Sequence, residues 1–239
     1  RNSGLRSGDL MINLDHLVYH NTGHAPPGQF TMMRPFGPAI GHTTLPNEII
    51  EDFNADISHG TNGPDWSDKL VGKVDAEHLI PSDVLEPHQA FFVDAALRYV
   101  ADYAHRNCRP IRQDIKPQVD IRSAWYVQQK ANDYNPLHLH TNAELSCIGY
   151  LQMPEGIEEE WEQDGLDHYP ANGHVEFVSG SPAFLSRATF MMRPKAGDFF
   201  IFPADMYHTV YPFKTDGERR SFSMNIVVSE LEQEQDDES

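Results

Sequence analysis

The sequence has only two cysteines, Cys108 and Cys147, among its 239 residues. Two cysteines cannot form a disulfide framework, and neither stands in a CxxC or zinc-knuckle spacing. This count excludes a disulfide-stabilised secreted scaffold and favours a reducing compartment. The sequence also lacks a run of the roughly 18 to 20 apolar residues that a membrane span requires, and its first residues lack the apolar core of a secretory signal. We therefore expect a soluble, cytoplasmic protein without a membrane partner.

Basic residues are scarce as well. Eighteen lysines and arginines stand against 36 acidic residues, which gives a formal net charge of −18. Such a charge repels phosphate backbones and makes nucleic acid an improbable partner. The apolar content of 39% is enough for a substantial core. We expect a single domain over residues 1–239, with an extension and a helix in 1–118, a core in 119–228 and an acidic tail in 229–239.

The first half of the chain is dominated by turn formers. Residues 1 to about 65 are rich in Gly, Pro, Asn and His, which predicts turns and irregular segments. Between residues 81 and 107, apolar side chains recur at helical spacing, and this pattern predicts one long helix that covers a face of a sheet. The side chains concerned are Phe91, Phe92, Ala95, Ala96, Tyr99, Val100 and Tyr103.

The second half reads as short strands divided by turns, which is typical of a sandwich or barrel. The expected strands lie in residues 119–129, 145–153, 173–180, 189–194, 197–204, 208–213 and 219–229. The acidic, turn-rich insertion 155–173 is expected to be a loop, and the charged residues from 229 onward a disordered tail. The predicted fold class is therefore mainly β.

Two histidines stand two residues apart in "NPLHLHTNAELSCIGYLQMP". If this segment begins a strand, His138 and His140 project from one face, because alternate residues of a strand point the same way. A reactive metal site needs about three protein ligands and open positions. His208, which follows the apolar strand "FFIF" and a proline turn, is the best third candidate. A histidine considered alone is more often an ordinary hydrogen-bonded residue.

The strand expected in "ERRSFSMNIVV" separates two rows of side chains. One row is polar and the other apolar. The polar row must line a cavity or face solvent, since buried polar groups need partners. An arginine fork beside a hydroxyl is a good receptor for a carboxylate. The polar row consists of Arg219, Ser221, Ser223 and Asn225, and the other of Arg220, Phe222, Met224 and Ile226.

The order of these motifs resembles the Fe(II)- and 2-oxoglutarate-dependent oxygenases. That superfamily has His-x-Asp/Glu, a distal His and then Arg-x-Ser, and here His138-x-His140 is followed by His208 and by Arg219-x-Ser221. More narrowly, "AWYVQQKANDYNPLHLHTNAELSCIGYLQMPEG" and "RPKAGDFFIFPADMYHTVYPFKTDGERRSFSMNIVV" are similar to a subfamily often found in marine bacteria and their phages. The resemblance covers about residues 120 to 228. Its motifs are specific in combination rather than singly.

The resemblance implies a role for each matching residue. His138 and His208 match the two iron-binding histidines, and His140 stands where the superfamily has a carboxylate. Asp133, Glu144 and Asp205 are nearby carboxylates, but strand alternation favours His140 as the third ligand. In the cosubstrate site, Arg219 matches the arginine that pairs with the distal carboxylate of 2-oxoglutarate, with Ser221 and Tyr150 assisting. Weaker candidates for the pocket lining are Asn225, Tyr126 and Trp125.

The implied fold is a double-stranded β-helix, or jelly-roll, with an N-terminal extension and a supporting long helix. The implied activity is a dioxygenase that consumes 2-oxoglutarate and O2, uses Fe(II), releases succinate and CO2 and hydroxylates an unidentified substrate. Ascorbate would support such activity. Two other readings stay open at this stage. One is a three-histidine metalloenzyme that does not use 2-oxoglutarate, such as a cupin-like oxygenase or a zinc hydrolase. The other is a noncatalytic metal-binding barrel.

Overall fold

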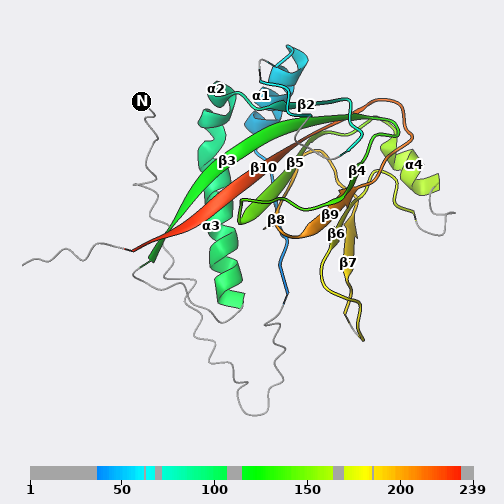
Figure 1. Ribbon diagram of the computed structural model, residues 1–239. Helices are drawn as coiled ribbons and strands as arrows, with labels where there is room; N and C mark the ends of the chain where they lie inside the picture. Colours follow the sequence, from blue (N-terminus) through cyan, green and yellow to red (C-terminus); the bar gives the residue numbers. More distant parts are fainter. Residues whose placement is uncertain are drawn as a thin grey trace, which may run out of the picture.

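Two antiparallel sheets form the frame of the protein (Figure 1). The computed structural model describes residues 37–61, 63–67, 72–106, 115–163, 170–184 and 186–232. The larger sheet has the order β1 (Gly41–Thr44), β8 (Asp198–Pro203), β5 (Leu145–Gln152), β10 (Glu218–Glu232), β3 (Ile115–Lys130) and β2 (Ala76–Leu79). The smaller sheet has the order β4 (Asn135–His138), β9 (Tyr207–Val210), β6 (Val175–Val178) and β7 (Thr189–Met192). The prediction of a mainly β, jelly-roll core is confirmed.

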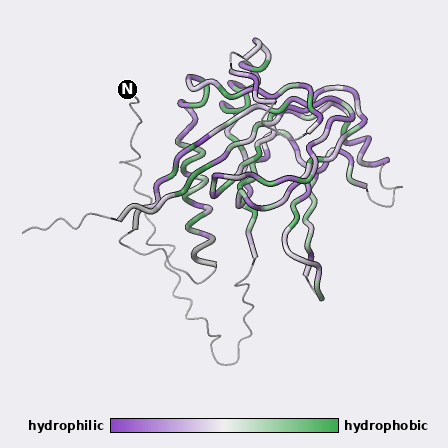
Figure 2. Tube along the Cα trace, viewed as in Figure 1, coloured by the Kyte–Doolittle hydropathy of each residue, from purple (hydrophilic) through white to green (hydrophobic). Residues whose placement is uncertain are grey.

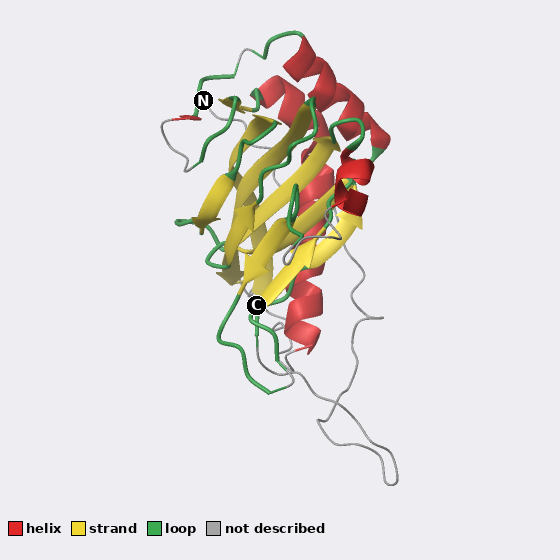
Figure 3. Ribbon diagram, turned by 90° about the vertical axis from the view of Figure 1, so that its right-hand side faces the viewer, coloured by secondary structure: helices red, strands yellow, loops and turns green. Residues whose placement is uncertain are grey.

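Helices cover the outer face of the larger sheet (Figure 3). They are α1 (Asn47–Ser58), α2 (Ser82–Leu85), the 3-10 turn η3 (Glu86–His88) and α3 (Gln89–Arg106), with the short α4 (Ile157–Gln163) elsewhere. The predicted long helix is therefore confirmed, although its first turns are the separate α2 and η3. Figure 2 shows hydrophobic and hydrophilic residues mixed along α3, as expected of a helix with one face on a core. In the described part of the chain, no helix is both long and apolar enough to cross a bilayer.

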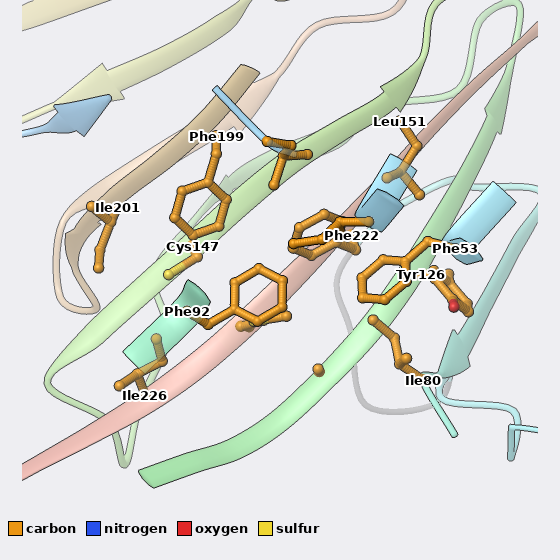
Figure 4. Packing of buried hydrophobic residues seen from close by; sticks show 14 of the residues in the cluster. Phe53, Ile80, Phe92, Tyr126, Cys147, Leu151, Phe199, Ile201, Phe222 and Ile226 are labelled. Carbon is orange, nitrogen blue, oxygen red and sulfur yellow. The ribbon is translucent and has the colours of Figure 1, made fainter. Parts of the chain in front are cut away.

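The main core lies between these helices and the larger sheet (Figure 4). Phe53 of α1 and Phe92 of α3 meet Phe222 of β10, with ring centroids 5.2 and 5.7 Å from that of Phe222. Phe222, Met224 and Ile226 are fully buried here. The apolar row of the last strand thus faces the helices, as its alternation predicts. The opposite face of the sheet is left to the interior of the barrel.

Three local predictions were wrong. The segment up to residue 65 contains β1 and α1, because Ile49, Phe53 and Ile57 recur every four residues and bury one helix face. The insertion expected to be a loop contains α4, whose Ile157 and Trp161 are buried in a small cluster with Phe213. The core strands also run past the predicted limits, since β3 begins at residue 115 and β10 ends at 232. Residues 233–239 and Cys108 lie outside the described residues.

Candidate metal centre

His138 and His208 are direct cross-strand partners. His138 ends β4, His208 lies in β9, and the antiparallel register places one opposite the other. Side chains in such a pair stand about 5 Å apart at Cβ. Their ring centroids are 4.2 Å apart. The smaller sheet therefore fixes two imidazoles side by side.

His140 reaches the same point from outside the strand. Its backbone N–H donates to the carbonyl of Ala204 at 2.8 Å, and this bond holds the segment after β4 in place. Its ring centroid lies 5.1 Å from that of His208. The prediction that both histidines head one strand was wrong. The chain instead leaves the smaller sheet, passes a left-handed turn at Asn142 (φ 61°) and enters β5 of the larger sheet.

The three imidazoles all have their Nδ1 atoms engaged. Nδ1 of His138 contacts the carbonyl of Pro136 at 2.7 Å, and that of His208 contacts the carbonyl of Met206 at 3.0 Å. Since a carbonyl only accepts, each Nδ1 carries the proton and each neutral ring keeps its lone pair on Nε2. Nδ1 of His140 contacts Asn225 Oδ1 at 2.7 Å, with Ser146 Oγ also near. Histidines that bind metals are commonly oriented by such a hydrogen bond from the ring nitrogen that does not face the metal.

Burial keeps these rings neutral. Desolvation lowers the pKa of His208 to about 3 and that of His140 to about 4, and it also lowers the pKa of His138. One ligand atom from each ring lies within 4.8 Å of the others. Three neutral imidazoles at this separation can hold one divalent ion. Among the described residues, this histidine group includes no carboxylate.

The alternative carboxylates serve other purposes. Asp133 accepts from the backbone N–H of Lys130, and Glu144 accepts from that of Val228. Neither belongs to the histidine group, and nor does Asp205. The structure thus brings together the three histidines that the sequence singled out and leaves the three carboxylates aside.

A cavity opens beside the histidines and continues along the inner face of the larger sheet. Its wall combines polar and apolar side chains from both sheets. The lining residues are Glu77, Trp125, Val127, Gln129, Asn135, His138, His140, Ile148, Tyr150, His208, Val210, Ser221 and Ser223. Sequence reasoning missed Glu77, Gln129 and Asn135 in this list. Gln129 could have been found, because it follows Trp125 and Val127 at the strand period of two.

The side chain of Tyr150 lines this cavity, and its buried hydroxyl lacks a hydrogen-bond partner among the described residues. Desolvation raises its pKa to about 12, an effect that the nearby Arg219 charge opposes. A buried hydroxyl without a partner is uncommon because it forfeits its hydrogen bond to water. The phenol is therefore a donor available to a bound molecule.

Arg219 is fully buried behind the cavity wall, and its hydrogen-bond partners are neutral. Its Nε and Nη2 donate to Gln129 Oε1 at 3.1 and 2.9 Å, and its Nη1 donates to the carbonyl of Gly173 at 3.0 Å. Desolvation lowers its pKa. A buried guanidinium without an anionic partner carries a large desolvation cost. The part of the cavity lined by Gln129 and Tyr150, in front of Arg219, is therefore suited to an anion.

The other predicted residues fall on both sides of the sheet. Ser221 and Trp125 line the cavity. Asn225 does not line it but bonds His140. Tyr126 was wrongly predicted to face the pocket. Alternation along β3 sends it to the helix side, where its ring meets Phe53 edge-on at 5.7 Å.

Residues 123–225, from β3 to β10, match a family model described as "Putative 2OG-Fe(II) oxygenase". The match places this region among the 2OG-Fe(II) oxygenases. It contains all three histidines, Tyr150, Arg219 and Ser221. The sequence-based recognition and the enzyme class, a 2-oxoglutarate-dependent dioxygenase, are confirmed at this level. The cofactors of this oxygenase class are Fe(II), 2-oxoglutarate and O2. The sequence matches no curated protein.

Solved structures similar to this chain include three prolyl hydroxylases. A prolyl hydroxylase from Trichoplax adhaerens, in complex with a hypoxia inducible factor peptide, is similar with a TM-score of 0.51 at 10% identity, over 80% of this chain and 83% of that one. A viral collagen prolyl hydroxylase from Paramecium Bursaria Chlorella virus-1, in a 2OG complex, gives 0.48 at 14% identity, over 78% and 94%. A Pseudomonas putida prolyl-4-hydroxylase gives 0.48 at 13%, over 79% and 91%.

Proposed function

We propose that this oxygenase is a hydroxylase that binds one Fe(II) through His138, His140 and His208. The support is the convergence of three neutral imidazoles whose Nδ1 atoms are already engaged, so that each Nε2 is left for an ion. A third imidazole replaces the carboxylate common in such sites. The protein ligands then contribute no negative charge, which leaves the ion more positive.

We also propose that the cosubstrate carboxylate binds at the Tyr150 end of the cavity. The observation that carries this proposal is an unpartnered phenol together with a buried guanidinium whose hydrogen-bond partners among the described residues are all neutral. Tyr150 would donate a hydrogen bond from its hydroxyl, and Ser221 is its direct cross-strand neighbour on β10. Arg219, one layer behind Gln129, would supply the positive charge that complements the acid.

The residues of this chain orient and shield the reactants. When bound, Fe(II) would supply the site at which O2, the oxidant, reacts, and 2-oxoglutarate would supply two electrons and leave as succinate and CO2, so that one oxygen atom is available for C–H hydroxylation. Asn225 and Ser146 fix the plane of the His140 ring, and the cross-strand register fixes His138 against His208. The aromatic side chains of Phe202 and Phe177 lie against His208 and keep water from that side of the centre.

Titration of 2-oxoglutarate tests the cosubstrate end. The protein is loaded anaerobically with Mn²⁺, and binding is followed by calorimetry. We expect Tyr150→Phe to weaken 2-oxoglutarate binding by about tenfold or more, because it removes one hydrogen bond to a charged group. Tyr207→Phe is the matched control, since Tyr207 is 48% exposed and lies outside the cavity. The affinity of Tyr207→Phe for 2-oxoglutarate should equal that of the wild type.

Succinate formation tests the reaction. With Fe(II) and air, the wild type should convert 2-oxoglutarate to succinate, and His138→Ala should not. Equal affinity of Tyr150→Phe and the wild type would mean that the carboxylate binds elsewhere. A metal-loaded protein that forms no oxygen-dependent succinate with any of a panel of substrates would contradict the proposed function as a whole.

The ligand set itself favours one second candidate. Three imidazoles without a carboxylate also suit zinc, so a three-histidine metalloenzyme that does not use 2-oxoglutarate remains the alternative. This alternative gives no functional reason for burying the charge of Arg219. Zinc found in the purified protein, together with no heat of binding on addition of 2-oxoglutarate, would favour it over the oxygenase proposal.

A further inference from the structure

Glu77 is a buried acid in the wall of the candidate active site. It lies in β2, the edge strand of the larger sheet, and only 3% of its surface is exposed. It is the one carboxylate among the cavity-lining residues. Its cross-strand partner is Val127, which also lines the cavity. The side chain therefore belongs to the inner face of the sheet and not to the outer surface.

No described residue forms a hydrogen bond or an ion pair with the Glu77 carboxyl. Burial raises its pKa to about 7, and the neighbouring Asp65 charge adds to this effect. A desolvated carboxyl of this kind is stabilised by a donor or a cation that it meets in the cavity. The histidine group of potential metal ligands does not include it. Its position thus calls for a partner that comes from solution.

The register of the sheet places Glu77 and Tyr150 at opposite ends of one row. Tyr150 stands opposite Ser221, Ser221 opposite Val127, and Val127 opposite Glu77. Three strand spacings separate the two ends, which is about 14 Å at roughly 4.8 Å each. A small diacid held at the Tyr150 end cannot also occupy the Glu77 end. The β2 end of the cavity is left for a second molecule.

We propose that Glu77 selects the prime substrate and that this substrate carries a basic nitrogen, either a protonated amine or a guanidinium. The inference rests on the proposed function and names the substrate class of the same site. The other lining side chains are neutral at neutral pH, so Glu77 gives this end of the cavity its charge. The formal net charge of −18 draws cations toward the chain and disfavours a second anion. A cation is therefore favoured over a neutral donor.

A paramagnetic binding experiment tests this selection. The protein is loaded with less than one equivalent of Mn²⁺, and 2-oxoglutarate is added anaerobically. Butylammonium is then titrated, and the broadening of its proton resonances reports its approach to the metal. Butan-1-ol is the neutral probe of similar size. We expect butylammonium to bind, and Glu77→Gln to weaken its binding at least tenfold, while butan-1-ol binds no better to the wild type than to the variant.

Glu51→Gln is the matched control, because it removes the same charge from an exposed position on α1. It should keep the wild-type affinity for butylammonium, which separates the Glu77 site from general attraction by the acidic surface. Equal binding of butylammonium to Glu77→Gln and the wild type would overturn the inference and leave the oxygenase proposal intact. Failure of Mn²⁺ and 2-oxoglutarate to bind would overturn the proposed function and this inference with it.

Discussion

Single side chains decide the chemistry of this barrel through the atoms that they leave unengaged. Nδ1 of each of the three histidines contacts a neighbouring oxygen, which leaves Nε2 for a metal ion. The hydroxyl of Tyr150 has no hydrogen-bond partner among the described residues, and none of these residues bonds the carboxyl of Glu77. Most other polar groups in the interior are paired, as is usual in proteins. Tyr150, Glu77 and the three histidines all line one cavity, and this shared position is the reason to assign them to ligands. The buried hydroxyl of Tyr126 and Oδ2 of Asp56, which also have no hydrogen-bond partner among the described residues, lie outside this cavity.

The Glu77 carboxyl should make the stability of the protein depend on pH. Burial raises its pKa from 4.5 to about 7, so the unfolded chain loses this proton before the folded one does. The contribution of this carboxyl to the stability of the wild type therefore falls as pH rises from about 4.5 through about 7. Glu77→Gln lacks this loss and should be more stable than the wild type by up to about 3 kcal/mol at pH 8, with no such gain below pH 4.5.

Urea unfolding of both proteins between pH 4.5 and 8 measures this difference. Glu51→Gln should show no pH-dependent gain, since Glu51 is exposed. A constant difference between Glu77→Gln and the wild type across the range would mean that the carboxyl is not desolvated in the folded protein.

At the scale of elements, β10 separates two adjacent arginines. Arg219 turns into the barrel toward Gln129, whereas Arg220 turns to the helix side, where its Nε bonds Glu218 at 2.7 Å and its Nη1 bonds Ser58 at 2.8 Å. This division could be predicted from the alternation of "RRSFSMN" alone. The role of Arg219 toward an acid stays a prediction.

The two arginines should differ in their effect on cosubstrate binding. We expect Arg219→Ala to weaken 2-oxoglutarate binding by roughly 30-fold to a few thousandfold, the equivalent of about 2 to 5 kcal/mol. Arg220→Ala should change this affinity by less than about threefold, because Arg220 turns to the helix side, where it bonds Glu218 and Ser58. Anaerobic titration of the Mn²⁺-loaded variants, checked for folding by circular dichroism, measures both. The reverse result would place the acid on the other face of β10.

The split between β4 and β5 shows where sequence reasoning stops. The letters "HLHTNAELSCIGY" predict one extended segment, since no proline or glycine interrupts the run before Gly149. The turn comes from Asn142, which tolerates a left-handed backbone, and from the bond of His140 to Ala204. Ala204 is 64 residues away in the sequence. Contacts of that range are set by the fold and are not visible in a local pattern.

For the whole molecule, the extension before residue 65 is part of the core and not an appendage. Phe53 is fully buried, and its ring packs edge-on against Phe222 and Tyr126. The stripe Ile49, Phe53 and Ile57 was visible in the sequence but was outweighed by the surrounding Gly, Pro and Asn. The positions of most core strands along the chain and of the long helix could be predicted because their patterns are longer and repeat more often.

Phe53→Ala should therefore lower the free energy of unfolding by about 3 to 5 kcal/mol, the usual cost of deleting a buried aromatic ring. Phe184→Ala should leave it unchanged, because Phe184 is 93% exposed. Urea titration measures both. The affinity of the folded Phe53→Ala protein for Mn²⁺ should match that of the wild type, since the ring lies on the helix side of the sheet. A large loss of affinity would show that α1 supports the metal centre directly.

The cross-strand pairing of His138 with His208 has a consequence for the stability of the folded chain. These two residues are 70 positions apart, and an ion bound by both would close that span as a covalent crosslink does. His140 lies in the segment that connects β4 of the smaller sheet to β5 of the larger sheet. The same ion would therefore also link the two sheets. Whatever binds the folded chain alone stabilises it, by about 2.7 kcal/mol at a hundred times the dissociation constant. Metal supply would then govern how long the protein survives as well as how fast it works.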